Sequence, residues 1–148
     1  MVGADATAHK ADLVADMNSA RQSILTRLSA PFELHAVIQE AALLHEFDGK
    51  PHIMRDQHRR LLELSARPNV TVQIVPLRRS VHIGSHGDFH VLMYGGQEAT
   101  VYNELLTSSF MTNEVHEVAR YQATMRALSE DVALPVEDST KLLSELSA

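Results

Sequence analysis

Four side chains that can bind metals or transfer protons fall within ten residues of the chain, HIGSHGDFHV (82–91). His86, Asp88 and His90 are spaced two residues apart, so in an extended strand they would share one face, while Phe89 would point the other way into the core. Two imidazoles and a carboxylate form the ligand set that suits non-haem Fe(II), and with a bound water this set also suits zinc. The stretch therefore raises the hypothesis of a metal site.

The geometry of a single strand weighs against that metal site. The Cα atoms of His86 and His90 would lie about 13 Å apart at roughly 3.3 Å per residue, which makes convergence on one ion difficult. We therefore expect no stoichiometric metal and no cofactor, and keep His86, Asp88 and His90 as secondary metal candidates. The preferred interpretation places His82, His86 and His90 at the rim of a pocket, where an imidazole can hydrogen-bond a ligand or transfer a proton near neutral pH.

A second group of polar residues lies beside apolar neighbours in the predicted elements: Glu40, Gln57 and Glu104. Buried amides and carboxylates require hydrogen-bonding partners. One interpretation is structural, a network that ties the first helix to the sheet through Arg21 and Gln22. The other is functional, with all three residues around one pocket in which desolvation favours a neutral carboxyl that binds or protonates a small molecule.

Apolar periodicity and turn signals predict one α+β domain over residues 1–148. Helical spacing predicts an N-terminal helix over 5–28, a long helix over 51–66 and C-terminal helices within 113–147. The clearest strand is VTVQIV (70–75), which is rich in β-branched residues. Further strands are expected at 32–39, 88–94, 99–105 and 106–112. The core over 32–110 should therefore form a small, mostly antiparallel sheet covered by amphipathic helices.

The composition excludes several classes of function. The 148 residues, 45% of them apolar, suffice for one compact domain. Nineteen acidic against thirteen basic residues give a net charge of −6, the wrong sign for a protein that binds nucleic acid. The chain has no cysteine for thiolate metal sites, and no apolar run approaches the roughly 18 residues of a membrane span. We expect a soluble, cytoplasmic protein that binds neither nucleic acid nor membrane.

Five ordered phrases of the chain resemble one protein family. They are similar to the domain of unknown function that follows the helix-turn-helix in actinobacterial XRE-type regulators of the WhiJ kind. In that family the regulators are often paired with a small partner protein in antitoxin-like systems, so the resemblance implies a domain that binds a small molecule or a small partner protein. The phrases, within residues 18–146, are RQSILTR (21–27), HAVIQEAAL (35–43), MRDQHRRLLELSARPNVTVQIVP (54–76), VYNELLTSS (101–109) and EVARYQATMRAL (117–128).

The chain departs from the family pattern in two ways. It starts directly at the helix that carries RQSILTR, where the family has its DNA-binding half. His86, Asp88 and His90 also fall outside the pattern, as does HEFDGKPH (45–52), where the family has a turn rich in Arg and Gly. The first departure predicts that the chain does not bind DNA by itself.

Two functions from different classes remain open. The leading hypothesis is a stand-alone domain that binds a small molecule or small partner protein and is related to the regulatory domain of those regulators. The alternative is a small enzyme of a natural-product pathway, such as a cyclase, an isomerase or a metal-dependent catalyst. Its catalytic candidates would be Glu40, Glu104, His86, Asp88 and His90. The chain could also be a piece of a longer regulator, and a homodimer is compatible with each hypothesis.

Overall fold

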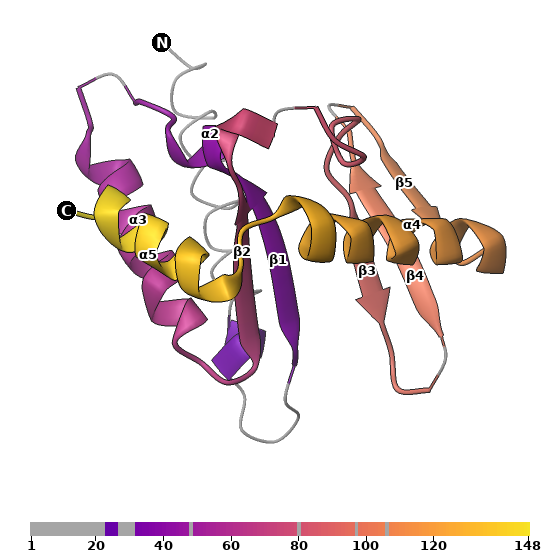
Figure 1. Ribbon diagram of the computed structural model, residues 1–148. Coiled ribbons are helices and arrows are strands. Elements are labelled where there is room, and N and C mark those ends of the chain that lie inside the picture. Colours follow the sequence, from indigo (N-terminus) through magenta and orange to yellow (C-terminus); the bar gives the residue numbers. More distant parts are fainter. Residues whose placement is uncertain (1–22, 27–31, 48, 80, 97, 106) are drawn as a thin grey trace, which may run out of the picture.

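The computed structural model describes residues 23–26, 32–47, 49–79, 81–96, 98–105 and 107–148 (Figure 1). Its helices and strands confirm the α+β class, although the strands divide between two small sheets. The predicted helix over 5–28, together with Arg21 and Gln22, lies outside the described residues except for the short 3-10 turn η1 (Ser23–Thr26). Among the described residues, no helix is long and apolar enough to cross a membrane.

The first sheet consists of two parallel strands, β1 (Leu34–Gln39) and β2 (Val70–Val75), with Leu34 opposite Val70. Parallel neighbours require a crossover connection, which here contains α2 (Glu40–Leu43) and α3 (His52–Ser65). Five of the six β2 residues are buried. A strand covered on both faces is rich in Val and Ile, so Val70, Val72, Ile74 and Val75 account for the burial of β2.

The main core lies between this sheet and two helices. Helix α3 and the C-terminal helix α5 (Val136–Leu146) pack against each other and against β2. Figure 1 shows the two helices side by side next to β2. We call β1, β2, α2, α3 and α5 the parallel half. With Leu25 of η1, it forms a cluster of buried apolar side chains that comprises Leu25, Leu43, Leu64, Val70, Val72, Ile74 and Leu143.

The second sheet is antiparallel and has the order β3 (His90–Met93), β4 (Ala99–Glu104) and β5 (Ser109–Thr112). Helix α4 (Val115–Ala127) lies across one face of this sheet (Figure 1). Val101 and Val118 are buried between them. Phe89 packs edge-on against Tyr121 of α4 with ring centroids 5.1 Å apart, which confirms its predicted direction. We call β3, β4, β5 and α4 the antiparallel half.

One buried amide joins the two halves. Gln73 of β2 is 6% exposed and uses its whole hydrogen-bonding capacity. Its Oε1 lies 2.6 Å from His35 Nε2 and accepts from Ser129 Oγ at 2.7 Å. Its Nε2 donates to the carbonyl oxygens of Ser129 and Leu134 at 3.1 and 3.0 Å. Because Ser129 belongs to the π-helical turn η3 (Leu128–Val132), this amide fixes the end of α4 to the first sheet.

Candidate functional site

The histidine-rich stretch does not form the expected continuous strand. Residues 83–86 form turns, residues 87–89 have no regular structure, and β3 begins only at His90. Because residues 86–89 are not part of a strand, strand alternation does not place His86, Asp88 and His90 on one face. All three side chains are exposed. Among the described residues, no group of three or more His, Asp or Glu side chains could hold a metal ion.

His82 is turned into its own loop. Its Nδ1 accepts the Gly84 N–H at 3.1 Å, so Nε2 carries the proton of the neutral ring. That Nε2 is buried and has no hydrogen-bond partner among the described residues. The loop also packs closely on Leu128, because a Cβ atom at Gly84 would lie only 2.8 Å from Leu128 Cδ1. His82 thus lies inside the loop rather than at an open rim, and its role in ligand binding stays a prediction.

The three residues Glu40, Gln57 and Glu104 are not brought together around one pocket. The Glu40 carboxylate accepts the Leu77 N–H at 2.8 Å and so holds the turn η2 (Leu77–Arg79). Gln57 is exposed on α3, and Glu104 is exposed at the end of β4. Figure 1 shows α2 and α3 on one side of the molecule and β4 on the other. Because the strands form two sheets, the ends of β1 and β4 do not meet, and the expected common pocket is absent from the described residues.

Sequence periodicity placed the wrong residue on the buried stripe of α3. Gln57 and His58 both lie between Met54 and Leu61, and either spacing fits a helix. The structure buries His58, which is 5% exposed, and leaves Gln57 exposed. His58 Nε2 lies 2.8 Å from the Leu43 carbonyl oxygen and its Nδ1 lies 2.9 Å from the Leu146 carbonyl oxygen. His58 is therefore the functional candidate that the sequence did not single out.

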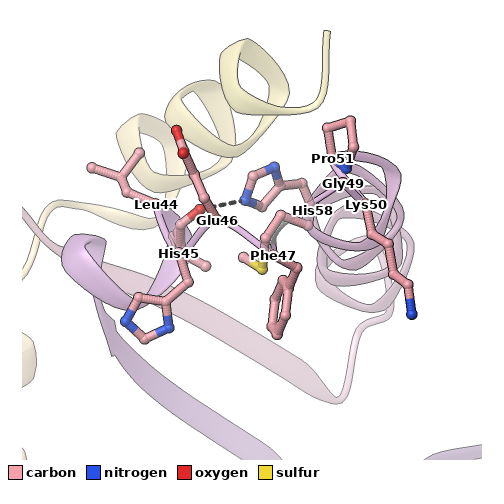
Figure 2. A pocket seen from close by; sticks show the side chains of 10 residues that line it. Leu44, His45, Glu46, Phe47, Gly49, Lys50, Pro51 and His58 are labelled. Atoms are coloured by element: carbon pink, nitrogen blue, oxygen red, sulfur yellow. Dashed lines mark hydrogen bonds between the residues drawn. The ribbon is translucent and has the colours of Figure 1, made fainter.

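His58 lies beside a hollow of about 440 Å³ between α3 and the loop 44–51 (Figure 2). The loop overlaps the segment HEFDGKPH (45–52). The apolar side chains of Leu44, Phe47 and Met54 line the hollow next to the ionisable groups of His45, Glu46 and Lys50. This volume falls within the range of small-molecule sites in proteins, about 300–1,000 Å³.

The antiparallel sheet carries a different candidate surface. By register, His90 pairs with Tyr102 and Tyr102 pairs with Met111, which forms a row across all three strands. The rings of His90 and Tyr102 are in contact, with centroids 5.9 Å apart. Side chains alternate along a strand, so this row lies on the face opposite the buried Val101 and therefore opposite α4. Together with Leu92 and Thr100 we call it the outer face.

Large apolar side chains remain exposed on and around the outer face. Met111 is 65% exposed, and Leu92 at 37% lies on the same side of the sheet. Further exposed apolar side chains of this sheet and its connections are Met93, Tyr94, Leu105 and Phe110. Of these, Met93 and Phe110 alternate with the outer-face row and so lie on the face toward α4. Exposed apolar surface can mark an interaction site on a soluble domain. In the sequence, the uncharged run LLTSSFMTN (105–113) indicates this surface. The sequence predicted a strand at 106–112 but not the exposure of its apolar side chains.

Comparison with known proteins places the chain in a family. No curated protein and no solved structure matched. The model of one family matches residues 1–145, nearly the whole chain. On this match, the chain belongs to the family described as domain of unknown function DUF5753.

Proposed function

We propose that this chain is a non-catalytic binding domain whose antiparallel half receives a partner protein. The observation that carries the proposal is the row of His90, Tyr102 and Met111 on the outer face, with Met111 65% exposed. The resemblance to the regulatory domain of actinobacterial XRE-type regulators supports it, because small partner proteins accompany those regulators. DNA binding would then belong to another chain or segment, since this chain carries a net charge of −6.

The size of the outer face indicates how the partner binds. Three strands about 4.8 Å apart and four residues long cover an area on the order of 200 Å². A stable interface buries about 800 Å² on each partner. The outer face alone is too small, so the partner must also contact the edge of the sheet and the exposed side chains near its ends, such as Tyr94 and Leu105.

Strand β5 provides that edge. It pairs with β4 on one side, and its other side carries no paired strand in the described part of the chain. Protective features of edge strands are charges, prolines and bulges, and the run 105–113 contains no charged residue and no proline. An extended segment of the partner would add to β5 through main-chain hydrogen bonds and place alternate apolar side chains against Met111.

The charges around the sheet define the chemistry of the partner. Glu98, Glu104 and Glu114 are exposed at the two ends of β4 and just after β5. A partner segment with apolar residues at its centre and basic residues at its ends complements this arrangement. Such charges raise the association rate and select the partner more than they increase affinity.

Site-specific crosslinking tests the proposal. A photoreactive amino acid replaces Met111 on the outer face, and in a control it replaces Val136, which is 44% exposed on α5. In cells of the native host we expect a discrete protein adduct only from position 111. The captured protein is then purified, and Met111→Lys should weaken its Kd at least tenfold, whereas Val136→Lys should leave it unchanged. Equal adducts from both positions, or none from position 111, contradict the proposal.

A further inference from the structure

We propose that the partner segment pairs antiparallel with β5 and carries an apolar residue followed two positions later by Arg or Lys. The apolar residue would lie opposite Met111 and the basic residue opposite Ser109. This inference rests on the proposed function and specifies which sequence the outer face recognises. The free main-chain groups of β5, the alternation of its side chains and the carboxylate of Glu104 support it.

The hydrogen bonds between β4 and β5 show which main-chain groups face the free edge. Leu105 donates its N–H to the Ser108 carbonyl at 2.9 Å, and the two residues continue the register of the strands. Opposite residues of an antiparallel pair alternate between hydrogen-bonded and non-hydrogen-bonded pairs. Ser109 and Met111 lie one and three positions beyond Ser108, so their N–H groups and carbonyls point away from β4.

Strand β3 provides an independent check of this alternation. Tyr94 donates its N–H to the Glu98 carbonyl at 3.0 Å, and alternation from this pair makes His90 and Tyr102 a hydrogen-bonded pair. Tyr102 therefore directs its main-chain groups to β3, and Met111 opposite it has no such bond to β4. In the described part of the chain, no further strand pairs with the outward groups of β5.

An antiparallel segment would bond to this edge through alternate residues. The partner residues directly opposite Met111 and Ser109 would each exchange two main-chain hydrogen bonds with β5. Directly opposite side chains lie on the same face of a sheet, so these two partner side chains would project on the outer face. The residue between them would turn its N–H away from β5 and its side chain toward the α4 side.

Met111 selects an apolar residue. Its side chain is 65% exposed and ends the row that starts at His90 and passes through Tyr102. A large apolar residue opposite Met111 would extend this row by one strand and cover the exposed thioether.

Glu104 selects the basic residue. It is exposed directly opposite Ser109, and alternation places it on the same face as Tyr102. None of the ion pairs between described residues includes Glu104. Because neighbouring strands are about 4.8 Å apart, the partner residue opposite Ser109 would lie about 10 Å from Glu104. The short Ser109 side chain leaves this path open, and the long side chain of Arg or Lys can extend across it to the carboxylate.

A second copy of the chain does not meet both requirements. The run 105–113 contains no charged residue. Pairing of β5 with the β5 of a second copy would therefore place no cation opposite Ser109, whichever register the two strands adopt. A foreign segment that has a basic residue two positions after an apolar residue complements both Met111 and Glu104.

N-methylated peptides test the direction and register of the added strand. The probe is the acetylated and amidated peptide Thr-Leu-Thr-Arg-Thr, and its Kd for the native chain is measured by NMR titration. N-methylation of its leucine or arginine removes a main-chain donor to β5 and should weaken the Kd about tenfold. N-methylation of the central threonine should change the Kd less than about twofold. The reverse pattern would indicate parallel pairing and overturns the proposal, as do equal effects at all three positions or no binding of the probe.

Charge reversal tests the contact with Glu104. Glu104→Lys should weaken the Kd of the probe about threefold and favour the peptide with glutamate in place of arginine. Glu98→Lys, the same change at an exposed position just before β4, should leave the preference for the arginine peptide unchanged. Equal effects of both variants would indicate a general attraction by net charge and overturn the proposed register.

The crosslinking experiment separates this inference from the proposed function. A discrete adduct from position 111, together with failure of the peptide pattern, contradicts the proposed strand sequence alone. Absence of the adduct contradicts the proposed function itself. Protection of the Ser109 and Met111 amides that rises with the concentration of the chain alone would show that a second copy occupies the edge, which also overturns the inference.

Discussion

The two halves of the molecule use their apolar residues in opposite ways. Around β2, Leu25 of η1 and six apolar side chains of the parallel half form one buried cluster, with Ile74 fully buried. In the antiparallel half, Val101 and Val118 are buried, while Leu92, Met93, Phe110 and Met111 remain exposed on the strands. Both halves contain β-strands and a covering helix. This difference is the basis of the proposal that the antiparallel half presents a surface for a partner, whereas the parallel half contains most of the buried core.

The largest effect on stability should come from the buried cluster. Ile74→Ala should lower the free energy of unfolding by about 2–5 kcal/mol, because it removes buried methyl groups and leaves a cavity. Met111→Ala on the outer face should change it by no more than about 0.5 kcal/mol, because the side chain is already exposed. Urea denaturation of both variants checks the contrast. Equal losses of unfolding free energy in the two variants would contradict the proposed difference between the two halves.

The next largest effect on the free energy of unfolding should come from the Gln73 hydrogen bonds that connect the two halves. Gln73→Leu removes the amide donor of the Ser129 carbonyl and leaves the Leu134 carbonyl with the Ser139 hydroxyl at 3.3 Å, which should cost about 1–3 kcal/mol. The amides of residues 129–134 should also exchange faster with solvent, since η3 loses its attachment to β2. The control is Gln39→Leu, the same change at the exposed end of β1, for which we expect a loss within about 0.5 kcal/mol. If Gln73→Leu leaves the free energy of unfolding unchanged, the Gln73 hydrogen bonds do not contribute to stability.

A smaller effect is expected where the loop 81–89 packs on the end of α4. Gly84→Ala should cost about 1 kcal/mol, because its Cβ would lie 2.8 Å from Leu128 Cδ1 and this flexible side chain would have to move. A Cβ at Gly95 would meet no atom within 4 Å, so Gly95→Ala is the matched control. Thermal unfolding of the two variants measures the difference. The prediction fails if Gly95→Ala is the more destabilising change.

The sequence predicted the elements better than their pairing. The abundance of β-branched residues over 70–75 identified β2, and helical spacing identified α3, α4 and α5. Pairing depends on contacts between residues far apart in the chain, and alternation along a strand does not reveal which strand lies next to it. The separation of β1 and β2 from the other strands was therefore not predicted, and the expected grouping of Glu40 with Glu104 failed with it.

The candidate sites show the same limit at single residues. Three or four residues from Met54, a helix can place either Gln57 or His58 on its buried side, and periodicity does not choose between them. The choice of His58 depends on the carbonyls of Leu43 and Leu146, which come from 15 residues before and 88 residues after it. The outer face was detectable in part, because the uncharged run 105–113 is unusual for an exposed edge strand.

Hydrogen exchange of the complex with the captured partner tests the central claim most directly. We expect the amides of β5 (Ser109–Thr112) to be protected when the partner is added, because they would donate to or lie beside an added strand. The amides of α3 and α5 in the parallel half should exchange as in the free protein. Protection confined to the parallel half, with β5 unchanged, would contradict the account.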